Sequence, residues 1–340
     1  MAPTIRDVAR AAGVSIATVS HALSGKRPVS GATRRRIQAA AERLGYRPNQ
    51  VAAAMITGRT MTLGVVVPDI ANPFFGGLVS AAERAAAARG FTVVVCSSEL
   101  DPELEARYVR ALADRRVDAL VYLGGTPRRN AALAELDVPL VAVDEALPWL
   151  AQNVSLVTSD QERGGRLAAE HLLALGYTEP GVVTGQRGLP TAKARLDGFR
   201  RVADVPRARV RWADYTFEGG RDAARDLLHA EPRVTALFCA NDLMALGALA
   251  VARELGRAVP DDLALVGFDD IFVSALVTPP LTTIRQPLSR LGEEAAQLAI
   301  DLIEGQTAGP ERRTLPVELV IRGSTGQGAA RARVLAAVDD

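Results

Sequence analysis

Gly13-Val14-Ser15-Ile16-Ala17-Thr18-Val19-Ser20-His21-Ala22-Leu23 has the pattern of a short helix that follows a tight turn. Gly13 suits the turn, and Ser15 is a good N-cap because its hydroxyl can accept a hydrogen bond from a free amide of the first helical turn. Val19 and Leu23 fall on one face, four residues apart. The opposite face carries Ile16, Ala17, Ser20 and His21. This pattern is typical of a helix-turn-helix, whose second helix meets base edges in the major groove.

Two further helices are predicted around this one. Thr4 and Asp7 have the spacing of a capping box and start a helix that runs to about Ala12. Ser30 caps a third helix over residues 31–44.

Ile37 and Leu44 of the third helix are expected to face inward, while its Arg34, Arg35 and Arg36 point elsewhere. The result is a small three-helix domain over residues 1–46. Because any small helical domain contains a short amphipathic helix with a Ser cap, this pattern alone does not establish contact with DNA.

The charge distribution favours DNA contact. Residues 1–60 contain ten Arg or Lys against Asp7 and Glu42, a net charge of +8, whereas the whole chain is only +1, so residues 61–340 carry −7. Affinity for duplex DNA that is independent of sequence comes mainly from neutralising phosphates. The N-terminal segment is therefore suited to phosphates, and the remainder is acidic.

Residues 47–60 are predicted to link the two parts. Pro48 breaks the chain, and Asn49 caps a short Ala-rich segment over residues 50–56. A helix this short is marginal alone. We expect it to need a second copy or DNA for stability.

From Thr62 onward, apolar strands alternate with helices. Runs that are apolar throughout and separated by helices indicate parallel sheets covered on both faces, and two doubly wound lobes fit the pattern better than one sheet. Strands are expected over 63–67, 92–96, 119–123, 140–143, 181–184, 236–240 and 263–267. Helices are expected over 75–89, 103–114, 130–136, 163–175, 192–203, 219–229 and 242–255. The fold class is thus α/β with an N-terminal all-α domain.

Ligands of such sheets bind beyond the carboxyl ends of the strands. The residues expected there include Asp69, Asn72, Phe74, Phe75, Asp144, Thr191, Arg195, Asn241 and Asp269. Carboxylates, an amide and one guanidinium facing each other suit a polyhydroxylated ligand, because each hydroxyl both donates and accepts. An aromatic face such as Tyr215 or Trp149 can stack on it. For some residues a structural role is the alternative: Asn241 and Asp242 can cap helix 242–255, and Asp69 can begin a turn.

Other classes of protein fit poorly. The N-terminus has no signal-peptide pattern and no run of eighteen apolar residues occurs, so we expect a cytoplasmic protein. Cys96 and Cys239 end apolar runs and are expected to be buried thiols, and the three histidines lack metal-ligand spacing. The sequence contains no nucleophile elbow, Walker loop or dinucleotide fingerprint, so neither an enzyme nor a cofactor is predicted.

Seven motifs, taken in order, closely resemble the LacI/GalR family of bacterial transcription regulators. They are Thr4-Ile5-Arg6-Asp7-Val8-Ala9, Gly13-Val14-Ser15, Thr18-Val19-Ser20, Tyr46-Arg47-Pro48-Asn49, Asn241-Asp242-Leu243-Met244-Ala245-Leu246-Gly247, Val266-Gly267-Phe268-Asp269-Asp270 and Pro280-Leu281-Thr282-Thr283-Ile284-Arg285-Gln286-Pro287. The resemblance spans residues 3 to about 325. It implies a helix-turn-helix, a hinge helix, and a core similar to periplasmic sugar-binding proteins that dimerises and binds an effector between its lobes.

The resemblance also implies which residues contact DNA. Ile16, Ala17 and His21 occupy base-reading positions, and Asn49, Ala52 and Met55 occupy hinge positions that enter the minor groove. Positions that touch the backbone or support it are Thr4, Ile5, Ser15, Thr18, Ser20, Ser24, Ser30 and Thr33. His21 stands where relatives commonly have Arg, which pairs bidentately with guanine, so the base preference there is expected to differ. Met55 stands where Leu is common, and it keeps the apolar character of a wedge.

The implied effector positions are Asp69, Asn72, Phe74, Phe75, Asp144, Thr191, Arg195, Tyr215, Asn241, Asp269 and Gln286. The function implied is a repressor of carbohydrate-utilisation genes that binds a pseudopalindromic operator and is switched by a sugar or sugar derivative. The alternatives are a purine- or other metabolite-responsive regulator with a corepressor and, more remotely, a sugar-binding receptor or an enzyme. The lobes are expected over about 61–157 with 288–316 and over about 158–287 with 317–325. The tail, 326–340, is too short for a tetramerising coiled coil, so a nucleoid-associated homodimer is expected.

Overall fold

The computed structural model describes residues 3–24, 28–46, 58–124, 126–150, 154–307 and 309–326, with Ser24 described in its backbone alone. The chain forms two compact units, Met1–Thr60 and Met61–Asp340. The expected hinge helix over 50–56, with Asn49, Ala52 and Met55, lies outside the described residues.

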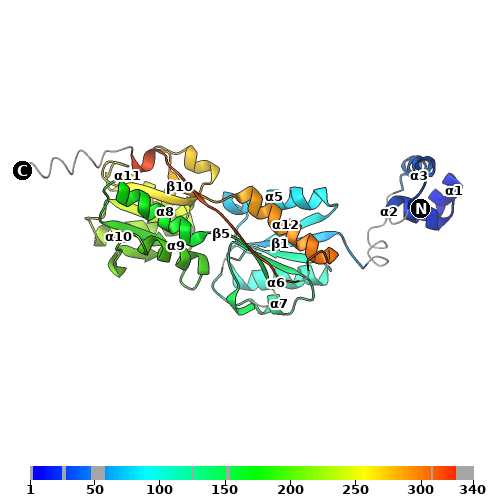
Figure 1. The fold of residues 1–340 in the computed structure, drawn as a ribbon, viewed down its shortest axis with the longest axis horizontal. Coiled ribbons are helices and arrows are strands. Elements are labelled where there is room, and N and C mark those ends of the chain that lie inside the picture. The colour runs from blue at the N-terminus through cyan, green and yellow to red at the C-terminus, as the bar shows by residue number, and fades with distance from the viewer. Residues whose placement is uncertain are drawn as a thin grey trace, which may run out of the picture. The chain divides into compact units, whose positions relative to one another are not determined.

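The N-terminal unit contains three helices, α1 (Ile5–Ala12), α2 (Ile16–Ser24) and α3 (Gly31–Leu44) (Figure 1). Their caps follow the sequence. Thr4 N–H donates to Asp7 Oδ2 at 2.9 Å, and the Ser15 hydroxyl accepts from Thr18 N–H at 3.1 Å. The core is formed by one buried residue of α2 and six from the flanking helices, Val8, Ala9, Ala12, Val19, Ile37, Ala40 and Ala41.

One inward residue of α3 was predicted wrongly. Leu44 is 36% exposed, whereas Ala40 and Ala41 join Ile37 in the core. The inward face of the helix is formed by Ile37, Ala40 and Ala41. Leu44 is the last residue of the helix, which ends at Gly45 with a φ of 65°. The expected exposure of Arg34, Arg35 and Arg36 is confirmed.

The first sheet of the C-terminal unit has six strands in the order β11-β5-β4-β3-β1-β2. They are β1 (Thr62–Val67), β2 (Thr92–Ser97), β3 (Ala119–Tyr122), β4 (Leu140–Val143), β5 (Ser155–Ser159) and β11 (Arg312–Leu315). Each neighbouring pair is parallel. The helices of this lobe are α5 (Pro73–Ala88), α6 (Pro102–Asp114), α7 (Ala131–Ala134) and α12 (Leu288–Glu304).

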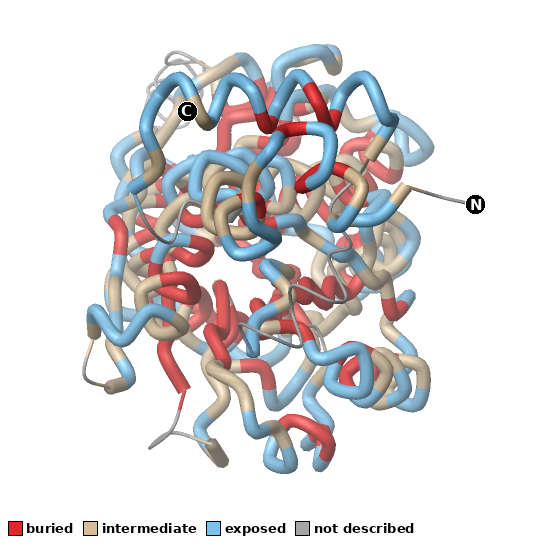
Figure 2. Tube along the Cα trace, turned by 90° about the vertical axis from the view of Figure 1, so that its right-hand side faces the viewer, coloured by how far each residue is buried: buried red, intermediate tan, exposed pale blue. Residues whose placement is uncertain are grey.

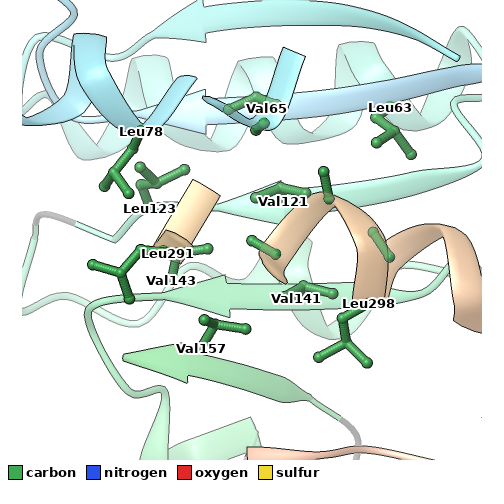
Figure 3. Packing of buried hydrophobic residues seen from close by; sticks show 14 of the residues in the cluster. Leu63, Val65, Leu78, Val121, Leu123, Val141, Val143, Val157, Leu291 and Leu298 are labelled. Carbon is green, nitrogen blue, oxygen red and sulfur yellow. The ribbon is translucent and has the colours of Figure 1, made fainter. Parts of the chain in front are cut away.

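Successive residues of these strands face opposite layers of helices. Val65 packs with Leu78 of α5 and Leu291 of α12, whereas Val66 packs with Leu112 of α6. Figure 3 shows the first of these layers, in which side chains of β1, β3, β4 and β5 point toward those of α5 and α12. The strands at the centre of the sheet are buried almost throughout, while the helices alternate between exposed and buried residues (Figure 2).

The second sheet also has six strands, in the order β12-β10-β9-β8-β6-β7. They are β6 (Pro180–Thr184), β7 (Val210–Trp212), β8 (Ala236–Cys239), β9 (Ala264–Asp269), β10 (Thr282–Arg285) and β12 (Glu318–Val320). All pairs are parallel except β10 with β12. Its helices are α8 (Gln161–Ala174), α9 (Pro190–Arg200), α10 (Phe217–Ala230) and α11 (Asp242–Glu254), and short 3-10 turns occur at Pro148–Leu150, Arg207–Arg209, Phe272–Ala275 and Gly323–Thr325.

This architecture confirms the expected fold class, in which a helical domain precedes two doubly wound, largely parallel sheets along the chain. The sequence prediction omitted β5, β7, β10, β11, β12 and α12. The chain passes between the sheets three times, after Ser159, through Gln286 and Pro287, and between β11 and β12. The first crossing lies two residues later than the sequence suggested.

Candidate functional site

Helix α2 has one face in the core and one face open. Val19 is fully buried, whereas Ile16 is 45% exposed and Ala17 is also exposed. Ser20 and His21 are half-buried on the same open side. An exposed branched apolar residue in the first turn of a helix that also carries a polar rim is suited to contact with a partner.

Hydroxyl pairs stand at the N-termini of α2 and α3. Ser15 Oγ lies 2.8 Å from Thr18 Oγ1, and Ser30 Oγ donates to Thr33 Oγ1 at 2.9 Å while accepting from Thr33 N–H. Helix N-termini favour anions, because their free amides and the helix dipole are positive. Thr4 uses its hydroxyl within its own capping box, donating to Asp7 at 2.7 Å. The side chain of Ser24 lies outside the described residues.

The C-terminal unit contains a cavity of about 220 Å³ beyond the carboxyl ends of the strands of both sheets. At roughly 30 Å³ for each water, this volume holds a small ligand. Every predicted effector residue lines it except Gln286; the lining residues are Pro68, Asp69, Asn72, Phe74, Phe75, Leu100, Gly124, Asp144, Glu145, Leu189, Thr191, Arg195, Asp214, Tyr215, Thr216, Phe217, Glu218, Asn241, Leu243 and Asp269.

Arg195 of α9 is the central polar residue of the cavity. Its Nε donates to Gln161 Oε1 at 2.7 Å, and its Nη1 donates to the carbonyl of Ala240 at 2.5 Å. Its guanidinium also lies within ion-pair distance of Asp144, at 3.7 Å, and of Asp269, at 3.9 Å. The side chain is 3% exposed, so these partners fix its position.

Aromatic rings shape the walls. The Arg195 guanidinium lies 3.9 Å from the centroid of the Phe268 ring, and Phe74 meets Phe75 edge to face with ring centroids 5.0 Å apart. Tyr215 reaches toward Thr191, with 3.3 Å between the two hydroxyl oxygens. Gly185 leaves room for this tyrosine, since a Cβ there would lie 2.1 Å from the Tyr215 ring.

Hydrogen bonds join the two lobes at the cavity. Glu145 follows β4 of the first sheet and accepts hydrogen bonds from Thr191 of α9, from N–H at 3.0 Å and from Oγ1 at 2.6 Å. Gln161, at the start of α8, donates to Asp144 Oδ1 at 2.6 Å. The cavity is therefore bounded by groups from both lobes that already contact each other.

Burial dominates the electrostatics. It raises the pKa of Asp144 and of Asp269, although Arg195 opposes the shift in both. Burial also raises the pKa of Glu145 to about 7, against the hydrogen bonds from Thr191. These carboxyls are costly to ionise in the absence of further positive charge.

Three of the lining residues have left-handed backbones. The φ angles are 64° at Asp144, 68° at Tyr215 and 111° at Asp269. Each such conformation costs on the order of 1–3 kcal/mol for a residue other than glycine, and such residues cluster at ligand-binding sites. Both carboxylates within ion-pair distance of Arg195 are thus placed by strained backbone.

Several expectations about individual residues need correction. Gln286 does not line the cavity; it donates to Asp269 Oδ1 at 2.8 Å from behind. Trp149 packs against a hydrophobic cluster of the first lobe and does not line the cavity. Asp242 is fully buried and does not line the cavity. It accepts hydrogen bonds from Ile271 N–H, Ser274 Oγ and Thr283 Oγ1, and so it holds the turn that follows β9.

Two residues combine the structural and the lining role. Asn241 caps α11 by accepting from Met244 N–H at 2.9 Å, and its amide donates to the carbonyl of Tyr215 at 2.9 Å. Asp69 accepts from Ala71 N–H at 2.8 Å within a turn. Both still line the cavity.

Other lining residues escaped prediction. Glu145 follows Asp144 directly, and its position beyond a buried strand was the available signal. Asp214, Phe217 and Glu218 follow the three-residue strand β7, which was not predicted. Leu243 gave no signal, because apolar residues at helix starts are common.

The part of the chain that the structure describes contains no cluster of His, Cys, Asp and Glu able to hold a metal ion, and none of its helices has the length and apolarity needed to cross a membrane. Both cysteines are free thiols; Cys239 is buried as expected, whereas Cys96 is only half-buried.

A helix-turn-helix with an open second helix, in one chain with a bilobal ligand cavity, defines a ligand-responsive DNA-binding protein. The family described as bacterial regulatory proteins, lacI family, matches residues 4–49, and that described as periplasmic binding protein-like domain matches residues 169–325. The HTH-type transcriptional regulator DegA of Bacillus subtilis (strain 168) is 35% identical over 335 residues, covering 96% of this chain and 98% of DegA.

Two further similarities agree. The ribose operon repressor of Escherichia coli (strain K12) is 36% identical over 329 residues, covering 94% of this chain and 99% of that one. The crystal structure of the lac repressor dimer bound to operator and the anti-inducer ONPF is 30% identical, with a TM-score of 0.81, and covers 96% and 100% of the two chains. The chain belongs to the lacI family of bacterial regulatory proteins and is a DNA-binding transcriptional regulator.

Proposed function

We propose that this regulator represses carbohydrate-utilisation genes by binding a pseudopalindromic operator as a homodimer, and that a sugar or sugar derivative in the cavity switches it. The observation that carries this proposal is the cavity around Arg195, which both lobes line with fixed polar groups. We place its action at the nucleoid, in the cytoplasm of a bacterium. The relatives named above are regulators, and we propose that the cavity binds its ligand without catalysis.

The chemistry of the cavity supports a polyhydroxylated ligand. Arg195 is a donor only, the carboxylates Asp144 and Asp269 are acceptors when ionised, and Thr191 and Tyr215 are both. A sugar hydroxyl donates to one such group while it accepts from another. The rings of Phe74 and Phe75 offer apolar surface to a sugar face.

A nucleobase is the second candidate, because the same aromatic rings can stack on a planar ligand. A sugar offers a hydroxyl donor at nearly every carbon, so the carboxyl groups along the walls favour it over a heterocycle with fewer donors. Purines are therefore included in the binding test below.

The switch follows from the position of the cavity between the lobes. A ligand that bridges Asp144 in one lobe and Arg195 in the other favours one relative orientation of the lobes. Residues 47–60, proposed as the hinge, then respond to that orientation. The change in DNA affinity equals the ligand's differential affinity for the two states.

On the DNA side, we propose that Ile16, Ala17 and His21 read bases and that Ser15, Thr18, Ser20, Ser30 and Thr33 position the phosphates. Thr4, Ile5 and Ser24 belong to the same surface, and Asn49, Ala52 and Met55 enter the minor groove. The exposure of Ile16 and Ala17 supports this assignment. The imidazole of His21 cannot reproduce the two parallel donors that an arginine fork offers to a base.

The test is a binding screen followed by a DNA titration. Purified protein is mixed with sugars and purines, and a ligand that binds only the folded state raises the melting temperature. Operator DNA is selected from a random pool, and its affinity is measured with and without each hit. If the protein binds its operator but no compound of a broad panel changes that affinity, the proposed switch is wrong.

The dimer is tested separately. The two N-terminal helix-turn-helix domains of a homodimer require two half-sites, so the selected DNA should be a pseudopalindrome. Sedimentation of the protein with that DNA should give two chains for each duplex. One chain on an asymmetric half-site would refute the proposal.

A further inference from the structure

Acidic side chains outnumber basic side chains in the cavity walls. Six carboxylates line the cavity, those of Asp69, Asp144, Glu145, Asp214, Glu218 and Asp269. Among the described lining residues, Arg195 is the only one with a cationic side chain. A ligand that enters this space therefore meets six carboxyl groups and one cationic group.

The single guanidinium is already shared. Arg195 lies 3.7 Å from Asp144 and 3.9 Å from Asp269, and its remaining hydrogen bonds go to Gln161 and the carbonyl of Ala240. It has no ion pair within 4.0 Å to Glu145. The one guanidinium is thus shared by the carboxylates of Asp144 and Asp269, and it makes no ion pair with Glu145.

Glu145 is the buried lining carboxylate that makes no ion pair within 4.0 Å. It is 5% exposed, and it accepts two hydrogen bonds from Thr191, which is neutral. The charged or titratable groups that act on it are Asp144, Arg195 and, through Thr191, Tyr215. Tyr122 also responds to the charge of Glu145.

A buried carboxylate without a cation is costly. It either takes up a proton or waits for a partner that supplies positive charge, and the raised pKa of Glu145 reflects this cost. An anionic ligand, such as a sugar phosphate or a sugar acid, adds repulsion from several carboxylates at once. An ammonium group on the ligand supplies what the wall lacks and can donate up to three hydrogen bonds.

We propose that the effector is a cationic aminated sugar or aminopolyol, and that Glu145 is the residue that selects its ammonium group. This inference rests on the proposed function, because it specifies the ligand of the same cavity. It commits to positive charge on the ligand, whereas the proposed function requires only a sugar or sugar derivative.

The experiment compares matched ligands by isothermal titration calorimetry on the full chain. Each set contains one hexose, its 2-amino form, its N-acetylated form and its 6-phosphate, for glucose, galactose and mannose. The proteins are the unaltered chain, Glu145→Gln and, as a matched control, Glu135→Gln. Glu135 is exposed and lies outside the cavity.

We expect the amine of at least one set to bind at least tenfold more tightly than both the parent and the N-acetylated sugar, and the phosphate to bind weakest. Glu145→Gln should lower the amine-to-parent ratio about tenfold, while Glu135→Gln should leave it unchanged. Circular dichroism confirms that each variant is folded.

The two proposals fail differently. If an uncharged sugar or a sugar phosphate binds as tightly as its amine in every set, or if Glu145→Gln leaves the ratio intact, the cationic effector is wrong and the sugar-responsive function stands. If none of these sugars binds and only a purine does, the proposed sugar function fails together with the inference.

Discussion

Arg195 holds together a network that four segments of the chain supply. Its buried guanidinium contacts Gln161, the carbonyl of Ala240, Asp144 and Asp269. Removing one partner of a buried charge pair leaves the others uncompensated, which costs more than the pair itself contributes. The cavity therefore depends on this one side chain for both shape and charge.

Replacing Arg195 by Met should lower the free energy of unfolding by about 3–5 kcal/mol and abolish ligand binding. Lys193→Met on the same helix is the control, because the Lys193 side chain is 76% exposed and pairs only at the surface with Asp197. Urea denaturation of both variants measures the difference. A loss below about 1 kcal/mol for Arg195→Met would show that the network is not stabilised by the guanidinium.

The stability of the protein should depend on the protonation of Glu145. Burial raises its pKa to about 7 from an ordinary value of 4.5. Because the folded state holds this proton more tightly, the associated stability is fully present below pH 4.5 and is lost as the pH rises to about 7. The contribution changes by at most about 1.4 kcal/mol per pH unit in this window.

Denaturation of the unaltered chain and of Glu145→Gln between pH 5 and pH 7 tests this dependence. The difference in unfolding free energy between them should shift with pH, with the unaltered chain gaining relative stability toward pH 5. Asp242, whose pKa burial also raises to about 7, is present in both proteins and cancels. Identical slopes for the two proteins would contradict the raised pKa of Glu145.

The sequence predicted single residues best where a strand ends. Asp144 and Asp269 directly follow or end buried runs, and topology alone brings such residues together. Glu145 was missed although it lies just beyond a buried strand, and its contact with Thr191 of the other lobe is visible only in the tertiary structure. Gln286 was placed in the cavity by resemblance, whereas it supports Asp269 from behind.

At the scale of elements, close helix packing fixes the position of Arg195. Helices α8 and α9 approach so closely that a Cβ on Gly165 would lie 1.9 Å from the Arg195 carbonyl oxygen, and one on Gly198 would lie 2.0 Å from the Glu162 carbonyl oxygen. Neither contact can relax by rotation of a side chain, because both involve backbone. The close backbone contact with α8 thus fixes the position of α9, the helix that carries Arg195 and Thr191.

Gly165→Ala should therefore separate α8 from α9. We expect a loss of about 1–3 kcal/mol in unfolding free energy and weaker ligand binding, since Arg195 and Thr191 move with α9. Arg166→Ala, at an exposed site on α8, should change neither beyond about 1 kcal/mol. If Gly165→Ala destabilised the protein but left the ligand affinity unchanged, the packing of α8 against α9 would not be what positions the cavity residues.

The two faces of α2 should respond differently to truncation. Val19→Ala removes buried methyl groups and should destabilise the N-terminal unit by about 2 kcal/mol. Ile16→Ala removes an exposed side chain, so it should leave the melting temperature unchanged and weaken operator binding. If Ile16→Ala and the unaltered chain bound the operator with equal affinity, Ile16 would not contribute to DNA binding.

Elements with a continuous apolar run were predictable, and those without one were not. The strands β1, β3, β4 and β8 are apolar and buried throughout or nearly so. The strand β12 has three residues with no buried position, and β7 has a single buried residue, so neither carries a hydrophobic pattern of its own. Their pairing depends on neighbours already in the sheet.

At the scale of the whole molecule, three chain crossings connect the lobes, and two of them carry residues that hold carboxylates of the cavity wall. Gln161 follows the first crossing and Gln286 lies in the second. Both donate hydrogen bonds to the carboxylates that flank Arg195, Asp144 and Asp269 respectively. A ligand that alters these contacts acts where the lobes are joined, which suits a protein that must report ligand binding elsewhere in the chain.

The most direct test of this account is the operator affinity measured by fluorescence anisotropy, with and without a ligand whose binding to the cavity calorimetry has established. Saturating ligand should change the operator Kd by about 5- to 150-fold, and Arg195→Met should bind operator without responding to the ligand. An operator Kd that stays the same while the ligand demonstrably occupies the cavity would contradict the claim that this cavity controls DNA binding.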